Sequence, residues 1–207
     1  MRGGRPFGAG LLDVARYCPN MRLVVVLPGG VATREVLAPL EVLHERLAPE
    51  VIWAARERGP VPGHDPPMSF HADVSLTEIE SQPTVLLLPG GFGSLELAMD
   101  QHVLAELRRL AEAPTICLAV STGSLPLAAA GLIDGLRVTG HWLSFSHLDR
   151  FGAVPVNEPM VISGRFLTAS GAVSAATLAD YVADRVWYGP GAPMTVAGSS
   201  VDFGQGP

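Results

Sequence analysis

Ser121 stands at the corner of a segment, TICLAVSTGSLPLAAAGL, that passes from apolar and β-branched residues into small ones. The pattern predicts a strand over 115–120 and a short helix over 122–132, with Ser121 between them. A side chain at such a corner faces the edge of the sheet, where the free N–H groups of the following helix also point. These groups would stabilise an oxygen that develops negative charge. Ser121 is therefore a candidate catalytic residue at a nucleophile-elbow position, with helix capping as the equal alternative.

Glu35 is the second candidate, because a carboxyl group can take up and release protons. It follows a predicted buried strand over 22–27, near the start of a predicted helix over 33–48. A carboxylate in a first helical turn also stabilises the helix dipole, which is the structural alternative. In an apolar cleft the same group would have a raised pKa and could exchange protons.

A glycine pair and one histidine complete the candidate set. Gly90 and Gly91 end the predicted strand over 84–91, where glycine lets a ligand approach the backbone. His141 follows another short strand in GLRVTGHWLSF, although a single histidine beside a tryptophan is more often packed than catalytic. Four further histidines have weaker cases, since they lie in predicted helix or loop without partners: His44, His64, His71 and His147.

Several common site motifs are missing. The two cysteines, Cys18 and Cys117, have no metal-ligand spacing, and Cys117 in mid-strand is expected to be a small buried hydrophobe. Neither a GxGxxG nor a P-loop pattern occurs. The hydrolase pattern GxSxG also fails, because Ala119 stands two residues before Ser121. We expect no metal and no organic cofactor.

Apolar segments alternate with amphipathic ones along the chain, which predicts a single-domain α/β fold: a doubly wound, mostly parallel sheet with helices on both faces. Further strands are predicted over 50–55 and 165–170, and further helices over 100–113 and 172–189. The proline-rich segment 56–76 is predicted to be a loop with short extended pieces, and Pro39 is expected to kink its helix or break its first turn. The domain is expected over 21–190, between a flexible N-terminal arm, 1–20, and a flexible C-terminal tail, 191–207. Ligands bind at the carboxyl ends of the strands in such sheets.

Composition narrows the function classes. The chain has 207 residues, 48% apolar and 16% charged, with a net charge of −6. That balance argues against nucleic-acid binding, which needs clustered Lys and Arg. No apolar run approaches the roughly 18 residues of a membrane span, and the N-terminus makes a poor signal peptide. We expect a cytoplasmic protein that acts on a small molecule, without a membrane or nucleic-acid partner.

The sequence resembles the DJ-1/PfpI superfamily and, within it, the isonitrile hydratase-like branch. The similar segments run in order from about 22 to 188: VVVLPGGVATREVLAPLEVL, VLLLPGGFG, AVSTGSLPLAAAGLIDGLRVTGHW and RFLTASGAVSAATLADYVADRV. The resemblance implies a flavodoxin-like fold and a homodimer.

The resemblance also assigns roles to individual residues. The acidic residue of the family falls on Glu35, and the histidine near the site in many members falls on His141. The substrate- or oxyanion-binding residues fall on Gly90, Gly91, Thr122 and Gly123. The catalytic cysteine falls on Ser121, and Thr122 replaces the histidine of the protease-like branch, which makes peptidase activity doubtful.

Serine in place of cysteine changes the expected chemistry. A cysteine can become a stable thiolate at a helix N-terminus, whereas a serine hydroxyl needs a general base. We therefore predict an acid–base enzyme of hydratase, lyase or cyclase type that uses Glu35, Ser121 and His141. The alternatives are a non-catalytic metabolite-binding or regulatory protein, and a hydrolase with Ser121 as its nucleophile.

Overall fold

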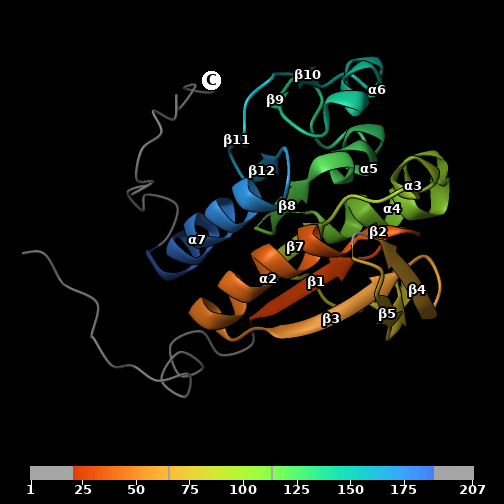
Figure 1. Ribbon diagram of the computed structural model, residues 1–207, viewed down its shortest axis with the longest axis vertical. Coiled ribbons are helices and arrows are strands. Elements are labelled where there is room, and N and C mark those ends of the chain that lie inside the picture. The colour runs from red at the N-terminus through yellow and green to blue at the C-terminus, as the bar shows by residue number, and fades with distance from the viewer. Residues whose placement is uncertain (1–20, 65, 113, 189–207) are drawn as a thin grey trace, which may run out of the picture.

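A seven-stranded sheet forms the centre of the protein in the computed structural model, which describes residues 21–64, 66–112 and 114–188 (Figure 1). In spatial order its strands are β11 (Met160–Ser163), β12 (Phe166–Ala169), β8 (Ile116–Val120), β7 (Val85–Leu88), β1 (Arg22–Val26), β3 (Glu50–Ala55) and β6 (Val74–Ser75). Every neighbouring pair is parallel apart from β11 and β12. The mostly parallel sheet is confirmed, while the predicted arm and tail lie outside the described residues.

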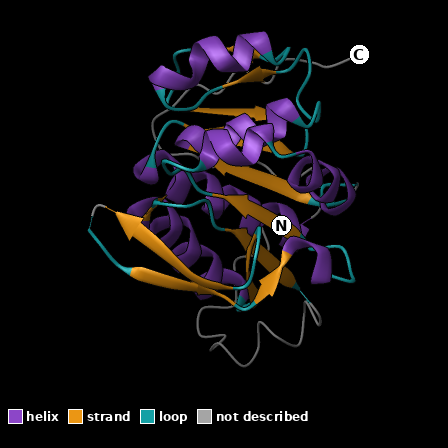
Figure 2. Cartoon of the chain, turned by 90° about the vertical axis from the view of Figure 1, so that its right-hand side faces the viewer, coloured by secondary structure: helices purple, strands orange, loops and turns teal. Residues whose placement is uncertain are grey.

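Helices cover both faces of this sheet (Figure 2). On one face α2 (Thr33–Leu47) packs against α7 (Ala172–Tyr188). On the other face lie α3 (Ser94–Met99), α4 (Gln101–Leu110) and α5 (Ser124–Ala129). Successive strand residues point to opposite faces, so Val24 and Val25 of β1 are both fully buried, one in each core. Coverage on both faces explains why the strand is apolar without alternation.

Two segments differ from the predictions. The proline-rich segment forms a hairpin of β4 (Gly59–His64) and β5 (Ser69–Ala72), and β4 pairs with a two-residue strand, β2 (Val31–Ala32). Prolines fit here because β2 pairs only with Gly63 and His64, so Pro60 and Pro62 have a neighbouring strand on one side only. The helix expected over 100–113 ends at Leu110 and is preceded by α3, which the sequence pattern did not indicate.

Pro39 does not break its helix. α2 runs from Thr33 to Leu47, and Pro39 is one of its buried residues. The helix expected over 122–132 is shorter: it begins as a 3₁₀ turn, η2 (Ser121–Gly123), and continues as α5 only to Ala129.

The carboxyl ends of β1 and β7 lie side by side, and their loops are joined by backbone contacts. The Ala32 N–H donates to the Gly90 carbonyl at 2.8 Å, and Val31 forms an isolated bridge with Gly91. β1 lies between β3, the next strand of this sheet along the chain, and β7, which comes later in the chain. The strand order therefore reverses between β1 and β7, and doubly wound folds bind ligands at such a switch point.

Candidate active site

Ser121 has an unusual backbone conformation at the end of β8. Its φ is +57°, a region that non-glycine residues seldom adopt, and its side chain is only 5% exposed. The N-cap of η2 is Val120 and that of α5 is Gly123, without a capping side-chain hydrogen bond in either case. The helix-cap alternative is therefore wrong. A backbone in this region is held only where the surrounding structure requires it, and such positions cluster at functional sites.

Glu35 lies in the first turn of α2 and reaches the other predicted residues across the switch point. The Gly90 N–H donates a hydrogen bond to Glu35 Oε2 at 2.9 Å. The Ser121 hydroxyl lies close enough to the same carboxyl group to act on its pKa. The structure thus brings together three residues that are far apart in sequence.

Burial raises the pKa of the Glu35 carboxyl group above its ordinary value of 4.5. The Gly90 N–H, the Ser121 hydroxyl and the positive charge of His64 each act in the opposite direction, and burial outweighs them. A carboxyl group with a raised pKa is better suited than an ordinary one to pass a proton in both directions near neutral pH.

Glu35→Gln is expected to make the protein more stable at neutral pH. A raised carboxyl pKa means that the folded protein binds this proton more tightly than the unfolded chain, so folding free energy is lost as the pH rises from 4.5 through the raised value. Glutamine keeps an oxygen for the Gly90 N–H and never ionises. The melting temperature of the variant should match that of the wild type below about pH 4 and exceed it near pH 7. Parallel melting curves over the whole range would contradict the raised pKa.

Gly90 has no space for a side chain. A Cβ there would lie 2.5 Å from Glu35 Oε2, 2.9 Å from Thr122 Oγ1 and 3.1 Å from the Cβ of Ser121. Because Gly90 has no side chain, the Glu35 carboxyl group can accept the Gly90 N–H, and the side chains of Thr122 and Ser121 can lie close to it. Binding of substrate by Gly90 stays a prediction.

Thr122 engages the backbone that was expected to bind an oxyanion. The Gly91 N–H donates to Thr122 Oγ1 at 3.0 Å, and this hydroxyl is also 3.0 Å from Ser94 Oγ. A ligand oxygen would therefore compete with Thr122 for the Gly91 N–H. Gly123, also expected to bind ligand, packs tightly against the end of β7.

His141 lies near the site through its neighbour, Gly140, where a Cβ would be 2.7 Å from the Ser121 carbonyl oxygen. The imidazole itself caps the 3₁₀ turn η3 (Trp142–Ser144): Nδ1 accepts from the Leu143 N–H at 3.3 Å. Its ring also stacks on Trp142. These contacts account for a structural role, and a catalytic role for His141 stays a prediction.

His64 is a site residue that the sequence interpretation missed. It ends β4, its Nδ1 lies 2.7 Å from the Gly30 carbonyl oxygen, and its charge acts on Glu35. The overlooked signal was alternation, because Val61 is buried between exposed Pro60 and Pro62, as in a strand with one buried face.

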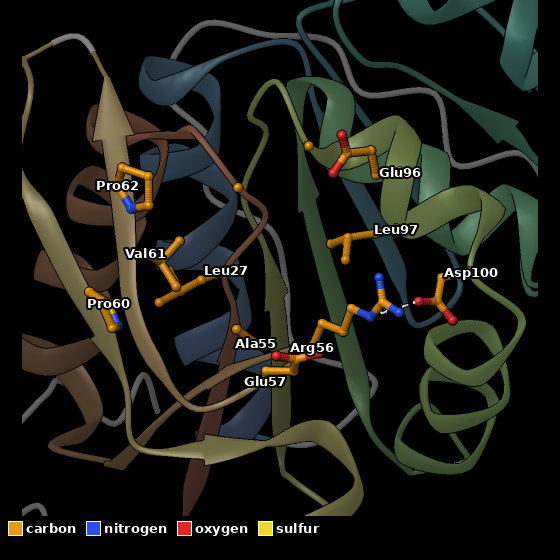
Figure 3. A pocket seen from close by; sticks show the side chains of 12 residues that line it. Leu27, Ala55, Arg56, Glu57, Pro60, Val61, Pro62, Glu96, Leu97 and Asp100 are labelled. Carbon is orange, nitrogen blue, oxygen red and sulfur yellow. Dashed lines mark ion pairs between the residues drawn. The ribbon is translucent and has the colours of Figure 1, made fainter.

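A cavity of about 190 Å³ lies next to this site, between the β4–β5 hairpin and α3 (Figure 3). Leu27, Val61 and Leu97 point into it, and Arg56 pairs with Asp100 at 3.0 Å on its rim. Its further lining residues are Gly29, Ala55, Glu57, Pro60, Pro62, Gly93 and Glu96. None of the sequence-predicted site residues lines it.

The described residues contain no other obvious reactive centre. Cys117 is fully buried, as expected, and burial raises the pKa of its thiol to about 12. Within 21–64, 66–112 and 114–188, no three His, Cys, Asp or Glu side chains gather where they could hold a metal ion. Over the same residues, no helix has the length and apolarity to cross a membrane.

The doubly wound sheet, the strained corner at Ser121 and the carboxyl group facing it define an α/β protein with a site at the switch point. The chain belongs to the DJ-1/PfpI family, whose family model matches residues 21–184. The superfamily resemblance is thereby confirmed.

Individual relatives refine this placement. The chain is 39% identical over 87 residues to isonitrile hydratase of Pseudomonas putida, an alignment that spans 42% of this chain and 38% of that protein. A two-domain Anabaena variabilis protein with DJ-1/ThiJ/PfpI-like and ferritin-like domains superposes with a TM-score of 0.77 at 20% identity, over 87% of this chain and 52% of that one. For Drosophila melanogaster DJ-1beta the TM-score is 0.71 at 23% identity, over 82% and 91%. These two structures support the fold alone.

Proposed function

We propose that the protein is a small-molecule enzyme of hydratase or lyase type in which Glu35 is the acid–base catalyst. The observation that carries the proposal is the half-buried Glu35 carboxyl group, which accepts the Gly90 N–H at 2.9 Å beside the Ser121 hydroxyl and has a raised pKa. The partial likeness to isonitrile hydratase supports addition of water as the reaction class.

Glu35 would carry the proton in such an addition. The carboxylate takes a proton from water as the water oxygen bonds to an electrophilic carbon of the substrate. The carboxylic acid then returns the proton to the atom that holds the electron pair released from the multiple bond, which is the heteroatom of an ordinary polar multiple bond and the terminal carbon of an isonitrile. The atoms of one water molecule are thus added, and Glu35 returns to its starting state. Elimination is the same sequence in reverse, and neither direction needs a cofactor.

Ser121 has a positioning role in this proposal. The family resemblance places the catalytic cysteine at this residue, and a serine hydroxyl is too weak an acid to form a stable anion there. A hydroxyl beside the carboxyl group can instead donate to a substrate or water oxygen and hold it in line with Glu35. The N–H groups of Thr122 and Gly123 lie at the start of a helical segment, where backbone N–H groups stabilise developing negative charge.

Turnover by Glu35→Gln tests the function. Wild-type protein is assayed by mass spectrometry against small apolar compounds with polar multiple bonds, isonitriles included, and kcat/KM is compared on any substrate found. We expect Glu35→Gln to lower kcat/KM at least about 100-fold. Glu41→Gln, an exposed change on the same helix, should leave it unchanged. Full activity in Glu35→Gln would overturn the role of Glu35, whereas metabolite binding without product would favour the non-catalytic alternative.

A homodimer is also proposed, on the family resemblance. Sedimentation velocity on the full chain would test it.

A further inference from the structure

We propose that His64 is a positioning residue of the Glu35 site, and that a positive charge on its imidazole favours the ionised form of the Glu35 carboxyl group. The catalytic meaning of this pairing rests on the proposed function. The pairing itself can be measured on the protein without a substrate.

The backbone places His64 beside the start of α2. β4 runs parallel to β2, and His64 is the register partner of Ala32. Neighbouring strands lie about 4.8 Å apart, and α2 begins at the residue after Ala32. Glu35 is in the first turn of that helix, so the hairpin brings His64 to the end of the helix that carries the carboxyl group.

A hydrogen bond fixes the protonation pattern of the imidazole. His64 Nδ1 lies 2.7 Å from the Gly30 carbonyl oxygen, and a carbonyl oxygen can only accept. Nδ1 therefore carries a hydrogen whether the ring is neutral or charged. Gain and loss of the titrating proton take place at Nε2, so the ring can change its charge without breaking the bond that orients it.

Phe92 holds the imidazole from its other side. The two rings stack with centroids 4.3 Å apart and an interplanar angle of 22°. The Phe92 N–H donates to the same Gly30 carbonyl oxygen at 3.2 Å. Gly30 has φ +61°, and a Cβ there would lie 3.0 Å from the Phe92 ring. Phe92 is 80% exposed, and its stacking on the His64 ring explains why an aromatic residue occupies this surface position.

The same loops hold Glu35. The chain leaves Gly30 through β2, where the Ala32 N–H donates to the Gly90 carbonyl, and the Gly90 N–H donates to Glu35 Oε2. His64 and Glu35 are thus fixed to one framework of two crossing loops. Movement of either loop would change the separation of the two groups.

Electrostatics agrees with this geometry. The positive charge of His64 lowers the pKa of Glu35 and partly offsets the effect of burial. Among the described residues, His64 is the one charged side chain that acts on Glu35 in this way. Arg34 precedes Glu35 on α2 and is exposed, and Asp65, which follows His64, lies outside the described residues. A charged imidazole therefore favours release of the Glu35 proton, and a neutral one favours its retention.

The test is the titration of the Glu35 side-chain carboxyl carbon, followed by NMR in full-length protein. His64→Gln keeps a side-chain N–H for the Gly30 carbonyl but cannot become charged. We expect the Glu35 midpoint to move to higher pH in His64→Gln. His71→Gln, which removes an exposed histidine from the adjacent strand β5, should leave the midpoint at its wild-type value. An unchanged Glu35 midpoint in folded His64→Gln would overturn the proposal.

A second measurement covers the case in which His64→Gln does not fold. In wild-type protein the Glu35 carboxyl signal should show a second, smaller inflection at the pH where the His64 ring signals titrate. A Glu35 signal that does not respond to His64 titration would overturn the pairing. Neither readout depends on turnover. A fully active Glu35→Gln variant would overturn the proposed function but would leave the coupling between His64 and Glu35 standing. Absence of that coupling would leave the turnover test of Glu35 unaffected.

Discussion

Alanine at position 123 is expected to lower the free energy of unfolding by about 3 to 5 kcal/mol. A Cβ at Gly123 would lie 2.0 Å from the Leu88 carbonyl oxygen, 2.8 Å from the Leu88 carbonyl carbon and 2.9 Å from the Pro89 carbonyl oxygen. All three atoms are backbone, so no side-chain rotation relieves the overlap. The corner after β8 and the end of β7 must separate.

The backbone of Gly123 makes this prediction specific. Its φ of −63° and ψ of −15° are helical, a conformation that alanine adopts more readily than glycine. Local propensity therefore favours the variant, and a loss of stability can come only from the packing. Urea unfolding gives the free energy, and Gly171→Ala, where a Cβ meets nothing within 4 Å, should change it by less than about 0.5 kcal/mol. A Gly123→Ala variant as stable as Gly171→Ala would show that the corner is not packed as described.

Buried parallel strands were the part of the fold that the sequence predicted best. β1 falls within the predicted 22–27 and β8 within 115–120, because residues buried on both faces leave a continuous apolar run. β3 covers the predicted 50–55, although only its last two residues are buried. The β4–β5 hairpin was missed because propensity disfavours proline in strands, whereas proline is tolerated where a strand is paired on one side only, as β4 is at Pro60 and Pro62. α3 is one and a half turns long and is stabilised by packing against α5 rather than by its own pattern.

The site was predictable where residue type decides the chemistry. Glu35, Gly90 and Ser121 were singled out from their places at strand ends, and the structure brings them into contact. The sequence could not reveal that Thr122 occupies the Gly91 N–H, since that depends on a side-chain rotamer. It also could not place His64, whose position depends on the parallel pairing of β4 with β2, two segments far apart along the chain. Contacts between segments that are distant in sequence leave no local pattern in the sequence from which they could be predicted.

Ser121→Cys is expected to create a thiol that reacts with iodoacetamide on the order of 1000 times faster than Cys117 at pH 7. An ordinary thiol with a pKa near 8.5 is a few per cent thiolate at this pH. Cys117, with a pKa of about 12, is thiolate to about one part in 10⁵. Peptide mass spectrometry compares residues 121 and 117 within one sample, so Cys117 is an internal control. Equal labelling at the two positions would show that residue 121 does not face an accessible site.

The double variant Glu35→Gln/Ser121→Cys then tests whether Glu35 reaches this position. An ionised carboxylate within hydrogen-bonding reach disfavours a thiolate, whereas a neutral amide can donate a hydrogen bond to it. We expect the double variant to be alkylated faster than Ser121→Cys at pH 7 to 8, with the difference shrinking at lower pH as Glu35 takes up its proton. Identical rates at every pH would mean that the carboxyl group and residue 121 are electrostatically independent. The positioning role proposed for Ser121 would then lose its basis, because a hydroxyl that holds a substrate oxygen in line with Glu35 must lie close enough to sense the charge of that carboxyl group.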